Sequence, residues 1–294
     1  MNKITNPIFK EFIDLKIINK KKIFKISNYT RDKKISVYKD RSSSVIFLER
    51  CITSSEYYKL VKYKNNPINK KFKKNIQTPM LEDDIRRVVQ FKKLFLRKKI
   101  LDYGCGWGVF LKNIKKSKSL TGIELRKECI SFIKKHFKKI FVTNNLRNLN
   151  GQKFDIITMF HVLEHMPHQV KILKSLKEKL SRHGKIIIEV PCANDFLISL
   201  DIEDFKKFTF WSEHLVLHTE KSLRQVLKKA GYKKIQITYY QRYNFANHLG
   251  WFVNKKPGGH DFFKEITDTI INKNYIKFLK RIKSTDTLIA IAEQ

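Results

Sequence analysis

A turn that contains three glycines is the part of this sequence best suited to binding a ligand. Residues 100–110 read ILDYGCGWGVF, so a short apolar segment ends at Asp102 and glycines follow at every second position. Glycine lets the backbone turn sharply, and a ligand can approach it without meeting a Cβ atom. A helix that begins there offers free N–H groups to the same ligand. The next apolar segment ends at Glu124, where a carboxylate can accept hydrogen bonds from both hydroxyls of a ribose.

The spacing of the glycines distinguishes between kinds of nucleotide. Dinucleotide sites usually read G-x-G-x-x-G, whereas this chain reads G-x-G-x-G with Asp102 two residues before the first glycine. That carboxylate would repel a pyrophosphate but suits a cationic amino-acid group, which disfavours a nicotinamide-dependent oxidoreductase. A second segment, residues 153–166, reads KFDIITMFHVLEHM. Together these segments resemble the class I S-adenosylmethionine-dependent methyltransferases, and the resemblance extends over residues 100–230.

The resemblance implies S-adenosyl-L-methionine as the cofactor and assigns its contacts. Asp102 and the loop from Gly104 to Gly108 would hold the methionine end, Glu124 the ribose, and apolar side chains the adenine. Many members of the family bind the adenine amino group with an acidic residue, but this chain has amides at residues 144–145. The cofactor-binding residues expected from the resemblance are Asp102, Gly104, Cys105, Gly106, Gly108, Glu124, Leu125, Asn145, Leu146, Phe160 and His161.

The pattern His161-x-x-Glu164-His165 admits three interpretations. An inverted zinc-protease motif needs these residues on one long helix, but a strand-like segment precedes His161 and Pro167 follows His165. Ubiquinone-pathway O-methyltransferases resemble this loop and hold a divalent ion there with two Glu and one His. Here His161 replaces the first Glu, and the mixed set no longer favours magnesium. The third interpretation is that Glu164 and His165 brace the loop by hydrogen bonds. We predict no metal site, and we expect His161 to border the transferred methyl group.

His214 is the first candidate for a catalytic general base, followed by His161. It lies in residues 210–219, FWSEHLVLHT, and relatives carry a similar E-H-L segment beside the acceptor pocket. A neutral imidazole titrates near the working pH, while a purely structural histidine remains an equal alternative. Residues 241–252 combine aromatic, amide and histidine side chains, which suits either a lid over a polar acceptor or a solvent-facing cap. They resemble poorly characterised bacterial methyltransferases associated with surface-glycan synthesis.

Strand-like and helix-like segments alternate from Asp83 onward, which predicts an α/β fold. We expect a Rossmann-like, mostly parallel sheet of about seven strands, with helices on both faces and an antiparallel last strand. Residues 83–294 would form this domain, with a substrate-facing insertion at 241–285 that exceeds an ordinary connection. Residues 1–82 would form an N-terminal extension or cap. A helix over 169–181 is expected to end at Gly184. The expected strands are 99–103, 120–124, 140–143, 154–160, 185–190, 234–240 and 287–292.

The composition is that of a globular protein with a large positive charge. Its 294 residues carry 62 Lys and Arg against 27 Asp and Glu, a formal net charge of +35. Only 12 of the basic residues are Arg, the side chain that favours bidentate contacts with nucleic acid, so we attribute the excess mainly to a general lysine bias. The four cysteines are scattered, and the sequence shows neither a signal peptide nor an 18-residue apolar stretch. We therefore expect a cytoplasmic protein with no membrane insertion.

The motifs and the composition lead to one expected function and two alternatives. The expected function is methyl transfer from S-adenosylmethionine to a small-molecule acceptor, preferably a sugar, a nucleotide-sugar or a related metabolite. An RNA-directed methyltransferase is the first alternative because of the positive charge. The Asp/Asn-Pro-Pro-aromatic motif of base-amine methyltransferases is absent, however, since residues 160–163 read FHVL. The second alternative is a non-catalytic cofactor-binding protein.

Overall fold

The computed structural model describes residues 4–54, 57–58, 82–266 and 269–294. Contacts between Cα atoms divide the chain into two compact units. Unit 1 comprises Met1–Ile52, His161–Ser175 and Ile188–Ala292, and unit 2 comprises Thr53–Phe160, Leu176–Ile187 and Glu293–Gln294. The chain therefore passes from one unit to the other several times. The predicted division of the chain at residue 82 remains a prediction.

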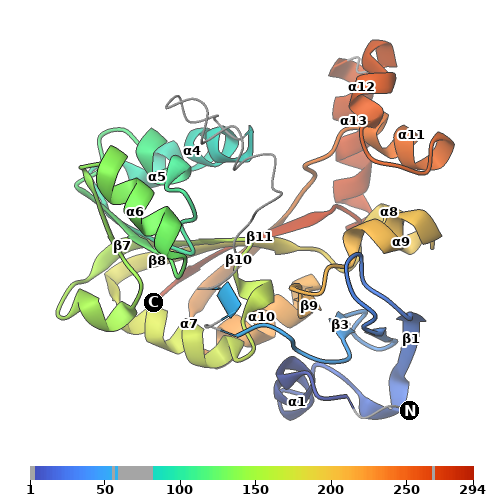
Figure 1. Ribbon diagram of the computed structural model, residues 1–294, viewed down its shortest axis with the longest axis horizontal. Helices are drawn as coiled ribbons and strands as arrows, with labels where there is room; N and C mark the ends of the chain where they lie inside the picture. Colours follow the sequence, from blue (N-terminus) through green and yellow to red (C-terminus); the bar gives the residue numbers. More distant parts are fainter. Residues whose placement is uncertain (1–3, 55–56, 59–81, 267–268) are drawn as a thin grey trace. The chain divides into compact units, whose positions relative to one another are not determined.

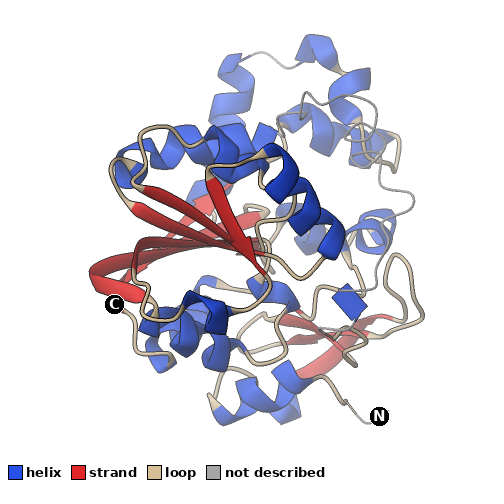
Figure 2. Ribbon diagram, turned by 60° about the vertical axis from the view of Figure 1, so that its left-hand side comes forward, coloured by secondary structure: helices blue, strands red, loops and turns tan. Residues whose placement is uncertain are grey.

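Seven strands form the large sheet that the strand-helix alternation predicts (Figure 1 and Figure 2). β4 pairs in parallel with β5 and β7, and β5 pairs in parallel with β6, while the C-terminal strands are antiparallel. The prediction of an α/β, Rossmann-like and mostly parallel sheet is confirmed. The strands follow one another across the sheet in the order β10 (Lys233–Tyr240), β11 (Thr287–Glu293), β8 (Leu180–Pro191), β7 (Phe154–Phe160), β4 (Lys99–Tyr103), β5 (Ser119–Ile123) and β6 (Ile140–Thr143).

Unit 2 is organised around β4, in which Leu101 is fully buried. Strands of a parallel sheet are covered on both faces, and this explains their continuous apolar runs. The aromatic side chains of α4 pack inward, since Phe91 stacks on Phe160 at 6.2 Å between ring centroids and Phe95 meets Phe110 edge-on at 5.7 Å. Acidic residues in the first turn of α4 and lysines in its last turn complement the helix dipole. The helices of this unit are α4 (Glu82–Phe95), α5 (Val109–Asn113) and α6 (Lys127–His136).

Unit 1 contains a second, four-stranded sheet in which every neighbouring pair is antiparallel. Asn6 ties the N-terminal helix α1 (Pro7–Asp14) to this sheet. Its side-chain oxygen caps the helix, and its Nδ2 donates to the carbonyl oxygens of Leu48 (2.9 Å) and Leu215 (3.0 Å). The strands follow one another in the order β1 (Ile23–Ser27), β2 (Val37–Asp40), β3 (Ile46–Leu48) and β9 (Val216–Leu217).

Helices fill most of the remaining part of unit 1. Thr219 caps α10 (Glu220–Lys229) in a capping box with Ser222. Within the predicted insertion, α11 (Phe245–Val253) and α12 (Gly259–Phe262) pack closely together. A Cβ atom on Gly250 would lie only 2.6 Å from the Cα of Gly259.

Among the described residues, no helix is both long and apolar enough to cross a membrane. The α-helices from residue 169 onward are α7 (Gln169–Glu178), α8 (Phe196–Ser199), α9 (Glu203–Thr209), α10 (Glu220–Lys229), α11 (Phe245–Val253), α12 (Gly259–Phe262) and α13 (Thr269–Arg281). The short 3-10 helices are η1 (Lys20–Lys22), η2 (Leu146–Leu149), η3 (Leu163–His165) and η4 (Lys264–Ile266).

The predicted role of Gly184 as a helix terminator is wrong. Helix α7 already ends at Glu178, and Gly184 lies inside β8. A Cβ atom on Gly184 would lie 2.9 Å from the carbonyl oxygen of Phe154 and 3.0 Å from the backbone nitrogen of Ser181. Glycine is therefore required there because two backbones approach closely. From one sequence, such a glycine cannot be told apart from a glycine that ends a helix.

Candidate active site

The glycine turn links β4 to α5 through three residues with left-handed backbone. Gly104, Gly106 and Gly108 have φ angles of 82°, 54° and 75°, which side chains with a Cβ atom adopt only at a cost. The N–H group of Gly104 donates to the carbonyl oxygen of Ile123 at 2.8 Å, so the turn is fixed to the end of β5. Gly108 contacts α6 rather than the cavity, since a Cβ atom there would lie 3.0 Å from Cγ1 of Ile133.

A cavity of about 170 Å³ lies against this turn within unit 2. It brings together five of the predicted cofactor-binding residues: Asp102, Gly104, Cys105, Gly106 and Phe160. Five further residues line it. Trp107 belongs to the predicted loop, whereas the other four were not predicted as contacts: Asp84, Arg87, Val109 and Phe110. The cavity is smaller than a typical cofactor site of 300–1,000 Å³, so it fits one end of a nucleoside-containing ligand.

Asp102 reaches this cavity from the end of β4, and its side chain is almost fully buried. The hydroxyl group of Thr158 donates to its Oδ1 at 2.7 Å. Burial raises the pKa of Asp102 to about 7, and the neighbouring Asp84 carboxylate adds to this, while Thr158 and Arg87 oppose it. Burial removes the water that would solvate an ionised carboxylate, so a cation that binds next to Asp102 stabilises its ionised form.

Asp84 and Arg87 bring a second carboxylate and a guanidinium to the same cavity. They lie three residues apart on α4, both are buried, and Arg87 Nη1 lies 3.3 Å from Asp84 Oδ1. The guanidinium of Arg87 also lies 4.7 Å from the ring centroid of Phe160. A cavity with both signs of charge suits a zwitterion such as an amino acid. In the sequence these two residues belong to a run of charged residues at the start of α4. Such a run usually indicates a solvent-exposed helix end and not a binding site.

Glu124 lies at the end of β5 as predicted, but its carboxylate already has protein partners. Oε2 accepts a hydrogen bond from the N–H group of Gly106 (2.9 Å), and Oε1 accepts one from the N–H group of Leu125 (2.8 Å). The Arg126 guanidinium donates to both oxygens at 3.1 Å. Burial favours the neutral acid, but the hydrogen bonds from Arg126 and Gly106 outweigh it and lower the pKa of Glu124. A ribose at this carboxylate would have to replace the guanidinium.

Asn145 and Leu146, expected near the adenine, do not line the cavity of unit 2. The Asn145 side chain is exposed and caps η2, where its Oδ1 accepts a hydrogen bond from the N–H group of Arg147 at 2.9 Å. Gly108, Glu124 and Leu125 are also absent from the lining. Apart from Gly108, the cavity therefore contains the residues predicted at the methionine end, whereas those predicted at the ribose and the adenine lie outside it.

In unit 1, His161 lies between two buried carboxylates. Its Nδ1 lies 3.2 Å from Glu164 Oε1, and its Nε2 lies 3.2 Å from Glu189 Oε1. Burial disfavours a charged ring, but the two carboxylates outweigh it and raise the pKa of His161. In turn, hydrogen bonding to His161 and the charge of His165 overcome burial and lower the pKa of Glu164 to about 2. His161 is thus favoured as an imidazolium, the form that cannot accept a proton.

His214 lies close to Glu164 and His165 in the same unit. The rings of His165 and His214 are 4.9 Å apart, and one ligand atom from each of the three residues lies within 4.8 Å of the others. His165 Nδ1 is hydrogen-bonded to the carbonyl oxygen of Glu213 at 2.9 Å. Burial, with the neighbouring His165, lowers the pKa of His214 to about 3. His214 is therefore neutral near pH 7, and two imidazoles with one carboxylate form a set that could hold a nitrogen-preferring metal ion.

The chain belongs to a family of methyltransferases. A family model described as a methyltransferase domain matches residues 73–237, which is more than half of the chain. The match includes β4, the glycine turn and the segment that follows β7. The predictions of an S-adenosylmethionine-dependent methyltransferase class and of its cofactor are confirmed at the level of this family.

Particular relatives include two ubiquinone biosynthesis O-methyltransferases. The one from Actinobacillus pleuropneumoniae serotype 7 is 31% identical over 100 residues, which are 30% of this chain and 43% of the relative. The mitochondrial one from Saccharomyces cerevisiae is 28% identical over 158 residues, 49% of this chain and 48% of the relative. The chain thus spans less than half the length of these curated relatives. Among solved structures, a SAM-dependent methyltransferase from Archaeoglobus fulgidus is 20% identical with a TM-score of 0.48, over 71% of this chain and 92% of that one.

Proposed function

We propose that this protein transfers a methyl group from S-adenosylmethionine to a small-molecule acceptor, and that the acceptor is a sugar, a nucleotide-sugar or a related metabolite. The observation that carries the proposal is the cavity of unit 2, in which two carboxylates, one guanidinium and a glycine turn meet. Membership of the methyltransferase family supports the reaction. The ubiquinone-pathway relatives support an acceptor of small-molecule size.

The methionine end of the donor would occupy the cavity of unit 2. Asp102 would accept hydrogen bonds from the α-ammonium group, and Arg87 would pair with the α-carboxylate. Glu124 would bind the ribose in exchange for Arg126. Since the sulfonium is intrinsically reactive, the protein contributes mainly by holding donor and acceptor at reacting distance and by excluding water.

His214 would accept the proton of an acceptor hydroxyl during the displacement at the methyl carbon. The ring of His214 is uncharged near pH 7, whereas the two carboxylates around His161 favour its charged form. Since a pKa of about 3 makes a weak base, the proton affinity of His214 would have to rise when the acceptor binds, and the neighbouring Glu164 carboxylate favours such a rise. We therefore assign the base to His214 and give His161 an electrostatic role as a positive charge held by Glu164 and Glu189. Glu164 would hold the His161 ring through the contact at 3.2 Å.

Two measurements test the proposed function. Isothermal titration should show S-adenosylmethionine binding to the intact chain and no binding to Gly106→Arg, because an arginine side chain would fill the cavity. Gly151→Arg is the matched control, since Gly151 also has a positive φ (67°) but a Cβ atom there meets nothing within 4 Å. Mass spectrometry of small metabolites incubated with a methyl-labelled donor then identifies the acceptor. A folded protein that does not bind the donor refutes the proposal, and donor binding without any methyl transfer supports a non-catalytic cofactor-binding protein.

An RNA acceptor is the second candidate, because one hollow of unit 2 is strongly basic. It has a volume of about 640 Å³, and the described residues that line it include one histidine and no carboxylate. The lysines that line it are Lys112, Lys115, Lys116, Lys118, Lys138 and Lys139. An RNA acceptor predicts binding that weakens steeply as salt concentration rises, with methyl label recovered in RNA rather than in small metabolites.

A further inference from the structure

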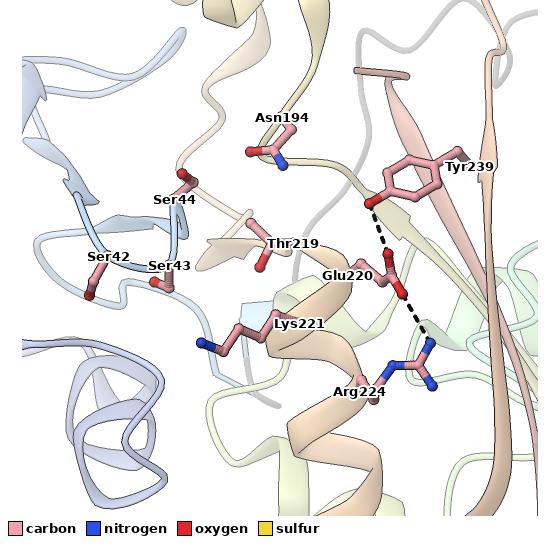
Figure 3. Close-up of a pocket in the computed structure, with 9 residues that line it drawn as sticks. All are labelled: Ser42, Ser43, Ser44, Asn194, Thr219, Glu220, Lys221, Arg224 and Tyr239. Carbon is pink, nitrogen blue, oxygen red and sulfur yellow. Dashed lines mark hydrogen bonds and ion pairs between the residues drawn. The ribbon is translucent and has the colours of Figure 1, made fainter. Parts of the chain in front are cut away.

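A polar cavity in unit 1 has no part in the proposed methyl-donor site. Its volume of about 420 Å³ lies in the range of small-molecule sites. Hydroxyl, amide and charged side chains from four separate segments line it (Figure 3). These residues are Ser42, Ser43, Ser44, Asn194, Thr219, Glu220, Lys221, Arg224 and Tyr239.

The place of this cavity in the fold favours a ligand. Asn194 follows the carboxyl end of β8 by three residues, and Tyr239 is the second-last residue of β10. In open α/β sheets, ligands bind outside the carboxyl ends of the strands. The turn between β2 and β3 adds the serine hydroxyls to this edge.

The charged residues that line the cavity leave the positive charge of Lys221 unbalanced. Glu220 is the carboxylate in the lining, and three groups already contact it: Arg224 Nη2 at 3.0 Å, the hydroxyl of Tyr239 at 3.1 Å and Lys283 Nζ at 3.5 Å. Figure 3 shows the first two contacts, and it shows Lys221 extending from α10 toward the serine turn. Among the described residues, the ammonium group of Lys221 has no ion-pair partner. An anionic group on a ligand would supply that partner.

The uncharged part of the lining suits a ligand with several hydroxyl groups. The hydroxyls of Ser42 and Ser43 donate to Asp40 Oδ2 at 2.6 and 2.7 Å. The Ser43 oxygen also accepts from the N–H group of Val45 at 3.4 Å, so one lone pair remains on it, while the Ser42 oxygen keeps both. The side chains of Ser44 and Asn194 have no hydrogen-bond partner in the described part of the chain, and both are partly buried. Donors and acceptors of this kind, spread around one cavity, match the hydroxyls of a sugar better than an apolar ring.

We propose that this cavity binds a phosphorylated sugar. Lys221 would pair with the phosphate, while Asn194, Ser44 and the oxygens of the other two serines would bind the sugar hydroxyls. The inference rests on the proposed function in one respect, namely that this ligand would be the methyl acceptor or a part of it. Binding itself needs no methyl donor, so it can be tested separately.

Isothermal titration of the intact chain with a panel of ligands tests the proposal. The panel contains hexose 1-phosphates, hexose 6-phosphates, nucleotide-sugars, the free hexoses and inorganic phosphate. We expect at least one phosphorylated sugar to bind, and the matching free hexose to bind at least tenfold more weakly. Lys221→Ala should weaken the phosphorylated sugar at least tenfold without changing the free hexose, and Asn194→Ala should weaken both. Lys228→Ala, which removes an exposed lysine of the same helix outside the lining, is the control and should change neither.

Two outcomes overturn the proposal: no phosphorylated sugar of the panel binds, or Lys221→Ala and Lys228→Ala bind it equally well. Circular dichroism of each variant confirms that it is folded. A parallel titration with S-adenosylmethionine separates the two proposals. Donor binding without sugar-phosphate binding refutes only this inference, whereas sugar-phosphate binding without donor binding refutes only the proposed function.

Discussion

The N–H group of Gly106 donates a hydrogen bond to Glu124 Oε2 at 2.9 Å, which joins the glycine turn after β4 to the carboxylate at the end of β5. The two features that the sequence suggested independently are thus in direct contact within unit 2. The same carboxylate is bound by Arg126, two residues further along the chain. The glycine turn, Glu124 and Arg126 therefore form one hydrogen-bonded group beside the cavity.

Arg126→Ala is expected to strengthen binding of S-adenosylmethionine by about tenfold. The substitution removes a charge-assisted pair that the ribose would have to displace, and such a pair contributes about 1.5 kcal/mol. Isothermal titration measures the change. Lys127→Ala removes an exposed charge from the adjacent position and should leave the affinity unchanged. Weaker binding to Arg126→Ala would mean instead that the guanidinium contacts the donor directly.

Donor affinity is expected to rise about fivefold between pH 6 and pH 7. The pKa of Asp102 is raised to about 7, so much of the free protein carries a protonated Asp102 at pH 6. Binding of a cationic ammonium group favours the ionised carboxylate and therefore releases a proton. Isothermal titration in two buffers with different ionisation enthalpies measures this release. A pH-independent affinity, or no proton release, would contradict the assignment of Asp102 to the ammonium group.

Asp102→Asn is expected to stabilise the ligand-free protein at pH 8 while it weakens donor binding. Because the folded-state pKa lies above the ordinary value of 3.8, the unfolded chain loses this proton first. The contribution of Asp102 to stability is therefore largest below pH 3.8 and falls as pH rises to 7. An asparagine does not carry this cost. Urea unfolding at pH 5 and pH 8 should show a clearly larger stability gain for the variant at the higher pH.

Glu164→Gln is expected to lower the free energy of unfolding by about 3 kcal/mol at pH 7, because the His161 imidazolium then loses a buried partner. The carboxylate has a pKa of about 2 in the folded protein against 4.5 ordinarily. Its stabilising contribution is therefore complete above about pH 5 and decreases as pH falls from 4.5 to 2. Urea unfolding across this range should show a weaker pH dependence for Glu164→Gln than for the unaltered chain. Glu178→Gln, at an exposed position, is the control.

Ser222→Ala is expected to lower the free energy of unfolding by about 2 kcal/mol. The Ser222 hydroxyl accepts from the N–H group of Thr219 (2.9 Å) and lies 3.1 Å from Nδ1 of His218, so two buried groups lose a partner at once. Ser175→Ala on α7 is the control, because its hydroxyl only contacts the carbonyl oxygen of Lys171. Chemical denaturation compares the two. Equal stability of both variants would show that solvent replaces the capping box.

The sheet and the position of the glycine turn could be predicted from the sequence because both depend on local patterns. Apolar runs identify buried strands, and alternate glycines identify the turn after β4. The contribution of Asp84 and Arg87 could not be predicted, since it depends on how α4 packs against Phe160. The pairing of Glu124 with Arg126 is likewise a choice between side-chain conformations, about which residue spacing contains no information.

Which face of α6 is buried could not be predicted from the sequence either. A helical period of 3.6 residues over 126–137 predicts that Ile130 and Ile133 share one face, whereas the structure buries Cys129 and Ile133 and leaves Ile130 partly exposed. The rotation of a helix about its axis is decided by its neighbours. Here Ile133 packs against the glycine turn, since a Cβ atom on Gly108 would lie 3.0 Å from its Cγ1.

The ion pair between Arg126 and Glu124 also bears on how fast the protein can turn over. Without a counter-charge, the buried Glu124 carboxylate would bind both the methyl donor and the demethylated product tightly. Release of either one would leave the negative charge of the carboxylate uncompensated. With Arg126 ready to take the vacated position, the departing nucleoside is replaced by an internal cation. The demethylated product would then leave and a new methyl donor would bind in its place. A moderate affinity of Glu124 for the nucleoside would therefore favour repeated catalytic cycles over tight retention of the product.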